Sequence, residues 1–125
     1  MKKTVGIDVS KSELDIFCDW NDIKLKVKNT AAGRKKLCKI LSKDTPNLVV
    51  LEATGIYHRA ILRELNLADI KVCLANPKRA RDFAKAVGVL AKTDQIDAML
   101  LARYGSEVNL KPSKPISIDQ EALLI

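Results

Sequence analysis

The chain has 125 residues, and its 22 lysines and arginines against 15 aspartates and glutamates give a net charge of +7. This length suits one domain, and a composition of 47% hydrophobic and 30% charged residues argues against intrinsic disorder. The apolar runs are far shorter than the roughly 20 residues of a membrane-spanning helix, so we expect no membrane partner. The acid Asp8 and the missing apolar stretch after the first lysines argue against a signal peptide. The positive charge favours a nucleic-acid partner.

The cysteines and the histidine do not form a metal-binding pattern. Cys18, Cys38 and Cys73 are odd in number and widely spaced, and His58 is the one histidine. A structural zinc site needs about four such ligands at short spacings. We therefore expect buried, reduced thiols in a cytoplasmic protein.

The first part of the chain predicts an antiparallel meander. Thr4–Asp8 is a β-type run that ends on an acid, and Leu14–Trp20 and Ile23–Val27 alternate apolar with polar side chains. The alternation gathers three lysines on one face: Lys24, Lys26 and Lys28. Such a face can follow a nucleic-acid backbone, although a solvated charged face is the commoner explanation.

Helices and strands alternate in the middle of the chain. Thr30 is a good N-cap for a helix that runs to about Ser42. Leu48–Leu51 is continuously apolar, which is typical of a central strand buried on both faces, and it is followed by Glu52. A helical stripe then comprises Tyr57, Ile61 and Leu65. Ile70–Leu74 is another short strand.

Two further helices are predicted before a polar, proline-bearing segment. Asn76 and Pro77 open the first of them, and the second follows Thr93. Its expected core positions are Ile96, Met99 and Leu100. We expect a catalytic domain over residues 1–107, then a linker and the start of a helix over residues 108–125 that leads to an absent C-terminal domain.

The predicted order is βββαβαβαα, which gives a mixed five-stranded sheet flanked by helices. This α/β arrangement is that of the ribonuclease H-like fold. Right-handed crossovers place the fourth strand parallel to the first and next to it.

Four acids occupy special positions in this order: Asp8, Glu52, Asp94 and Asp97. Asp8 and Glu52 end neighbouring parallel strands, so they meet at one carboxyl edge, where open α/β sheets place their active sites. Asp94 and Asp97 are three residues apart in the first turn of the last helix and share a face. Converging carboxylates repel each other unless cations lie between them, and oxygen ligands suit Mg²⁺ or Mn²⁺. A pair of such ions can clamp both oxygens of a phosphodiester displacement.

Three of these acids also have an ordinary structural explanation, whereas Glu52 directly follows a run that should be buried. Asp8 can cap a turn, and Asp94 can be an N-cap with Asp97 beside the helix dipole. The compatible placement of all four favours the metal site over these separate explanations.

Several motifs resemble the N-terminal domain of the insertion-sequence family one-ten transposases, which also contains the Piv-type DNA invertases. The matching blocks are Gly6-Ile7-Asp8-Val9-Ser10-Lys11, Glu52-Ala53-Thr54-Gly55-x-Tyr57, Asn76-Pro77 and Ala91-Lys92-Thr93-Asp94-x-x-Asp97-Ala98 with Leu101-Ala102. The resemblance covers about residues 4–105. It implies a domain similar to the Holliday-junction resolvase RuvC, whose Asp-Glu-Asp-Asp metal quartet falls on Asp8, Glu52, Asp94 and Asp97. It also implies DNA recombination through strand cleavage and rejoining, which moves or inverts a mobile element.

One departure from the family is large. Its members continue into a C-terminal domain with a serine thought to be the nucleophile, whereas this chain ends at Ile125. The resemblance therefore implies the metal half of a site without its nucleophile. Some family members use a structured guide RNA, and synapsis of two DNAs implies self-association of the full-length protein.

Basic side chains are candidates for contacts with nucleic-acid phosphates. Lys11 and Lys92 flank the acids, and a helical cluster comprises Lys78, Arg79, Arg81 and Lys85. Aromatic residues are only 4% of the chain, so base stacking should contribute little.

Two alternatives remain open at this point. A sugar-kinase or actin-like lobe shares this fold and often begins Gly-Ile-Asp-x-Ser, but it needs glycine-rich phosphate loops, and the five glycines here are isolated. A non-catalytic nucleic-acid-binding or dimerisation module predicts that the acids do not converge or that no divalent ion binds.

Overall fold

The computed structural model describes residues 2–53, 55–88 and 96–113. Five strands and four helices follow one another in these ranges, in the order that the sequence predicts. They are β1 (Thr4–Val9), β2 (Glu13–Cys18), β3 (Ile23–Lys28), α1 (Ala31–Lys43), β4 (Leu48–Glu52), α2 (Arg59–Leu67), β5 (Val72–Ala75), α3 (Pro77–Ala86) and α4 (Ala98–Glu107). Among the described residues, no helix is both long enough and apolar enough to span a bilayer.

The strands form one mixed sheet in the order β3-β2-β1-β4-β5. β1 and β4 are parallel, as are β4 and β5, whereas β2 runs antiparallel to both of its neighbours. The predicted adjacency of the first and fourth strands is confirmed, with Ile7 opposite Leu51. The residues of β4 from Leu48 to Leu51 are at most 1% exposed, as expected of a central strand covered on both faces.

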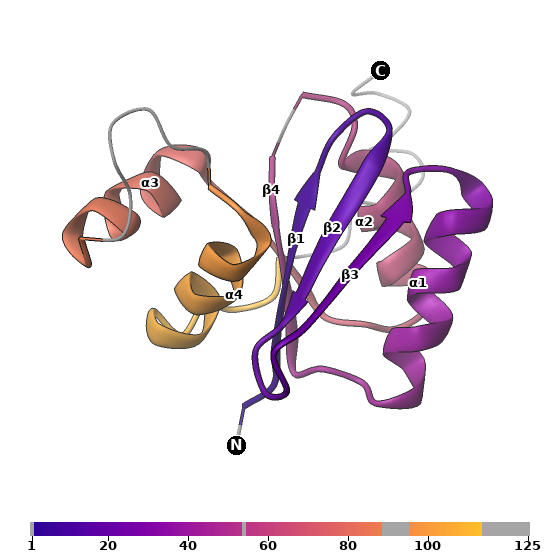
Figure 1. Ribbon diagram of the computed structural model, residues 1–125, viewed down its shortest axis with the longest axis horizontal. Coiled ribbons are helices and arrows are strands. Elements are labelled where there is room, and N and C mark those ends of the chain that lie inside the picture. The colour runs from indigo at the N-terminus through magenta and orange to yellow at the C-terminus, as the bar shows by residue number, and fades with distance from the viewer. Residues whose placement is uncertain (1, 54, 89–95, 114–125) are drawn as a thin grey trace.

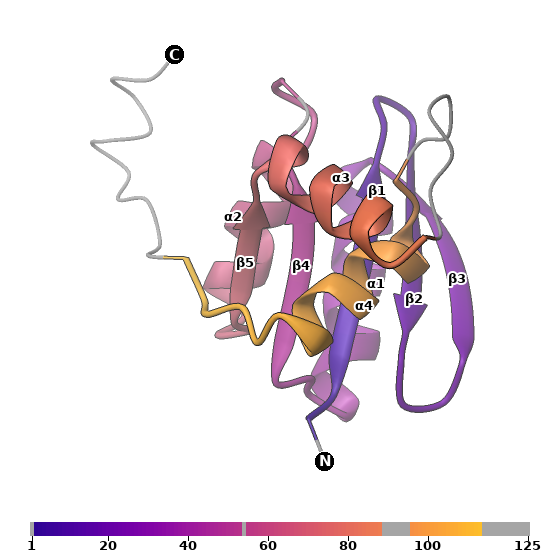
Figure 2. The ribbon, with the colours of Figure 1, turned by 90° about the vertical axis from the view of Figure 1, so that its left-hand side faces the viewer.

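Helices cover the two faces of the sheet in pairs. α1 and α2 lie on one face, and α3 and α4 lie on the other (Figures 1 and 2). The core under α1 and α2 includes Ile7, Leu14 and Leu51, and the core under α3 and α4 includes Val50 and Leu101. Because strand side chains alternate between faces, the neighbours of Ile7 and Leu51 along their strands point toward α3 and α4.

The predicted N-caps of two helices are confirmed. The Thr30 hydroxyl accepts a hydrogen bond from the Gly33 amide at 3.1 Å, and the Asn76 side chain accepts from the Lys78 amide at 2.9 Å. These side chains satisfy amides that have no partner inside the helix. The caps fix where α1 and α3 begin.

α4 packs directly on β1 because the facing residues are small. A Cβ atom on Gly6 would overlap the carbonyl oxygen of Ala98 and lie 2.7 Å from the amide nitrogen of Ala102. Only glycine permits this backbone approach. Ala98, Ala102 and Phe17 form a small buried cluster at the same contact. The first turn of α4 is thereby fixed over the carboxyl-terminal half of β1.

Some predicted details are wrong. Met99 was expected in the core, but 45% of it is exposed, because α4 turns Ala98 and Ala102 toward β1 instead. Tyr57 is 41% exposed, since α2 begins only at Arg59. Cys18 and Cys73 are buried and free as predicted, whereas Cys38 is only partly buried.

Candidate metal and nucleic-acid site

Asp8 and Glu52 lie side by side at the carboxyl ends of β1 and β4. They occupy the next register step after the paired Ile7 and Leu51, on the face that α3 and α4 cover. Burial raises the pKa of Glu52, and the negative charge of Asp8 raises it further, while the Arg81 guanidinium acts in the opposite direction. The two carboxylates are therefore close enough to repel each other, as the sequence predicts.

Asp8 lies near an acid that is not part of the predicted quartet, Asp15. Burial raises its pKa most, followed by the charges of Asp15 and Asp97. Asp15 faces Asp8 across the β1–β2 pair, and the Lys26 ammonium lies 3.5 Å from its carboxylate. We did not predict Asp15 at this site. The alternation of β2 places it on the face opposite Leu14 and Ile16, but only the hairpin register sets it against Asp8.

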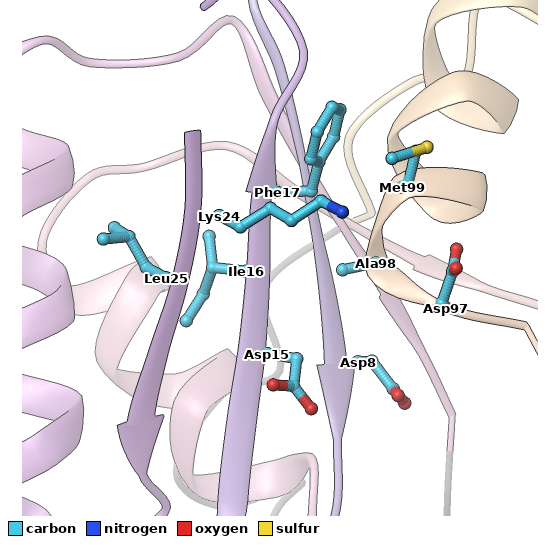
Figure 3. Close-up of a pocket in the computed structure, with 9 residues that line it drawn as sticks. All are labelled: Asp8, Asp15, Ile16, Phe17, Lys24, Leu25, Asp97, Ala98 and Met99. Carbon is cyan, nitrogen blue, oxygen red and sulfur yellow. The ribbon is translucent and has the colours of Figure 1, made fainter. Parts of the chain in front are cut away.

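Asp97 lies near Asp8, as predicted. The prediction that it lies inside the first turn of the last helix is wrong. It is the N-cap of α4, and its carboxylate accepts a hydrogen bond from the Leu100 amide at 2.8 Å. Figure 3 shows this carboxylate turned toward its own helix and away from that of Asp8. The helix begins later than expected because Asp97 supplies the strong cap. Asp94 lies outside the described residues.

The described residues carry suitable donor atoms for a divalent cation, but they do not gather three of them around one point. Within residues 2–53, 55–88 and 96–113, no three His, Cys, Asp or Glu side chains form a group that could hold a metal ion. The available donors are carboxylate oxygens, which are the ligands of hard cations such as Mg²⁺ and Mn²⁺. The Asp8–Glu52 pair thus has donor atoms that suit a divalent metal ion, and the nearby Asp97 carboxylate accepts the capping hydrogen bond from the Leu100 amide.

A pocket of about 190 Å³ opens beside Asp8, between the β2–β3 hairpin and the start of α4. Figure 3 shows Asp8 and Asp15 on neighbouring strands, Asp97 at the start of α4, and a lysine side chain that extends across the pocket. The other residues that line the pocket are Ile16, Phe17, Lys24, Leu25, Ala98 and Met99. The pocket therefore combines an acidic rim, an apolar wall and one cation.

The predicted basic residues are distributed unevenly around the acids. Lys11 is exposed in the turn between β1 and β2. On α3, Arg79 and Lys85 are exposed, and the Lys78 ammonium lies 3.3 Å from the Asp82 carboxylate one turn away. Arg81 is half-buried and acts on Glu52, as described above. Lys92 lies outside the described residues.

Comparisons of the fold identify its structural relatives. Two solved structures of Thermus thermophilus RuvC, one in complex with a Holliday junction substrate, match with TM-scores of 0.61 and 0.62 at 15% and 14% sequence identity. The matches cover 89% of this chain and 99% of each RuvC chain. At this identity the likeness establishes the fold alone, and it confirms the predicted ribonuclease H-like, RuvC-like architecture.

Comparisons of the sequence identify its family. Pilin gene-inverting proteins of Moraxella bovis and Moraxella lacunata are 31% and 33% identical over 118 residues. These matches cover 87% of this chain and 36% of each relative, so the chain spans about a third of the length of these relatives. A family model described as "Transposase", that of the DEDD transposases of the IS110 type, matches residues 5–124. The chain therefore belongs to this transposase family, as the resemblance of its motifs predicted.

Proposed function

We propose that this chain is the metal-dependent catalytic domain of a DNA transposase or site-specific recombinase, which cleaves and rejoins DNA strands to move or invert a mobile element. The observation that carries the proposal is the placement of Asp8 and Glu52 on adjacent parallel strands, one step beyond Ile7 and Leu51. Membership of a transposase family and relatives named for inverting a gene support the same class of chemistry here.

In this proposal the metal ligands are the predicted quartet: Asp8, Glu52, Asp94 and Asp97. A pair of Mg²⁺ or Mn²⁺ ions would supply Lewis acidity at the reacting phosphodiester. Asp8 and Glu52 hold negative charge at a fixed place because their strands are locked in the centre of the sheet. The Arg81 guanidinium lowers the pKa of Glu52, whereas burial, Asp15 and Asp97 all raise the pKa of Asp8.

DNA is the proposed substrate, and its backbone is the proposed partner of the basic residues: Lys11, Lys78, Arg79, Arg81, Lys85 and Lys92. We further propose that the serine nucleophile lies outside this chain, beyond a domain of residues 1–107 and a linker of residues 108–125. We also propose that the full-length protein associates with itself and that it is cytoplasmic. A structured guide RNA is a further proposed partner.

The proposal is tested by Mn²⁺ binding, because a chain without the nucleophile need not cleave DNA. Mn²⁺ broadens the NMR signals of nearby nuclei, so the backbone amide signals of Asp8 and Glu52 in the ¹⁵N-labelled chain should disappear first during a titration. Asp8→Asn should abolish this selective broadening. Glu107→Gln is the matched control, since its carboxylate lies at the far end of α4 in a pair with Arg103.

The opposite result separates the catalytic proposal from the non-catalytic module. If Mn²⁺ broadened no signals near Asp8, or if Asp8→Asn bound Mn²⁺ as tightly as the unaltered chain, the metal-dependent function would be refuted. The chain would then be interpreted as a non-catalytic module that binds nucleic acid or another copy of itself.

A further inference from the structure

The pocket beside Asp8 is lined by apolar residues as well as by acids, and the proposed metal ligands do not explain the apolar part. Its apolar wall is formed by Phe17, Ala98 and the exposed Met99. Methionine is flexible and polarisable and is common at binding surfaces, so Met99, which lines the pocket and is 45% exposed, is suited to contact a bound molecule. The acidic rim and this wall face the same space (Figure 3).

The lysine in this pocket is placed differently from its neighbours on β3. The Lys26 ammonium is held between Asp15 at 3.5 Å and Glu13 at 3.8 Å. Within the described part of the chain, the Lys24 ammonium has neither an ion pair nor a hydrogen bond. Figure 3 shows its side chain lying across β2, so that the ammonium ends near Phe17 and Ala98. A cation aimed into a pocket without a protein partner is available to an anion.

The size of the pocket limits what fits there. A volume of about 190 Å³ is below the roughly 300–1,000 Å³ of pockets that enclose whole small ligands. It suits one sugar or base of a longer molecule whose remainder lies outside. The proposed metal ions would neutralise the acidic rim beside Asp8. The rest of the pocket presents an apolar surface and one free cation, which match a nucleotide with its apolar ring face and anionic phosphate.

We infer that this pocket is a subsite for one nucleotide of the DNA strand beside the reacting phosphodiester, with Lys24 binding a backbone phosphate and Met99 contacting the sugar or base. The inference rests on the proposed function, because the DNA strand is the substrate proposed above. It adds a positioning role for two residues outside the quartet. Lys24 holds the strand, and Met99 limits how the neighbouring nucleotide lies against α4.

Strand β3 supplies a matched control for Lys24. Lys28 is exposed on the same face of the same strand and likewise has no ion pair among the described residues, but it lies outside the pocket. Lys24→Ala and Lys28→Ala therefore change the net charge equally. Only a phosphate bound at the pocket distinguishes them, and exposed substitutions of this kind should leave folding intact.

The experiment measures the binding of a fluorescent thymidylate oligodeoxynucleotide to the chain over a range of salt concentrations. Lys24→Ala should weaken binding several-fold and reduce the slope of log affinity against log salt by about 0.7, the value for one lost phosphate contact on a single strand. Lys28→Ala should leave the slope unchanged. Met99→Ala should weaken binding without changing the slope, because it removes no charge.

NMR locates the contact with the same probe. The amide signals of Lys24, Ala98 and Met99 should shift together as the oligonucleotide is added. Equal effects of Lys24→Ala and Lys28→Ala, or shifts confined to α3, would overturn the inference while Mn²⁺ binding at Asp8 still supported the proposed function. Shifts at the pocket that depend on protein concentration alone would also overturn it, since a second copy of the chain would then be the occupant. Failure of the unaltered chain to bind Mn²⁺ near Asp8, by contrast, would refute the proposed function.

Discussion

Replacing Gly6 with alanine should separate β1 from α4 and thereby disturb the candidate site. The added Cβ would overlap the Ala98 carbonyl oxygen and approach the Ala102 amide nitrogen to 2.7 Å, and both of these are backbone atoms of α4. A flexible side chain could rotate away, but a helix backbone must move as a unit. The movement would loosen the packing of Leu101, which is 0% exposed.

The expected destabilisation is large for a single methyl group. Overpacking of a well-packed core typically costs about 1–3 kcal/mol, and a clash with backbone on two sides belongs at the upper end, about 3 kcal/mol. With a urea dependence of about 2 kcal/mol per molar for a domain of this size, the unfolding midpoint should fall by about 1.5 M. The single tryptophan, Trp20, packs against the core and provides the fluorescence signal.

Gly55→Ala is the matched control for this substitution. Gly55 has a φ angle of +68°, and a Cβ there would meet nothing within 4 Å, so the substitution adds backbone strain without a clash. Such strain costs about 1–2 kcal/mol. If Gly6→Ala lowered the urea midpoint no further than Gly55→Ala does, the close contact of β1 with α4 would be refuted.

Further predictions concern the acids. Burial and neighbouring charge raise the pKa values of Asp8 and Glu52 in the fold, so the folded state binds protons more tightly than the unfolded chain. The two ionised carboxylates therefore destabilise the fold. This destabilisation is absent at pH below the unfolded pKa values and fully present above the folded ones. Asp8→Asn should therefore raise the urea midpoint at neutral pH and flatten its rise on acidification; a midpoint lowered at neutral pH would contradict this. Asp97→Ala should cost about 1 kcal/mol of stability through the lost cap, whereas Asp97→Asn should retain the cap. Both should weaken Mn²⁺ binding if Asp97 is also a ligand, which calorimetry can measure. Saturating Mn²⁺ should raise the thermal midpoint of the unaltered chain but not of Asp8→Asn.

The sequence predicted the parts of the fold that local patterns determine. The apolar run Leu48–Leu51 identified the central strand, and the chirality of crossovers placed it beside the first strand. These two features together predict that Asp8 and Glu52 meet at one edge of the sheet. Most boundaries were correct to about one or two residues, but α4 begins at Ala98 and not near Asp94 as predicted.

The details that escaped prediction depend on tertiary contacts. The region from Thr93 to Asp97 contains several good N-caps, and local sequence does not rank them; the packing of Ala98 on Gly6 makes Asp97 the one that caps α4. The same contact turns Met99 outward. The pairing of Asp15 with Asp8 depends on the register of the β1–β2 hairpin. The residues that connect these strands, Ser10, Lys11 and Ser12, do not specify one loop length or turn type, so the sequence alone does not determine that register.

The position of α4 adds to the negative charge of the site. On the face under α1 and α2, apolar side chains continue through Val9 to the end of β1. On the other face, Gly6 lies directly beneath the first turn of α4, and Asp8 is the next residue along that face. The first turn of α4 therefore packs on β1 immediately before Asp8 along this face. Asp97, which caps that turn, lies near enough for its charge to raise the pKa of Asp8, so the start of α4 at Ala98 brings a further negative charge to the site.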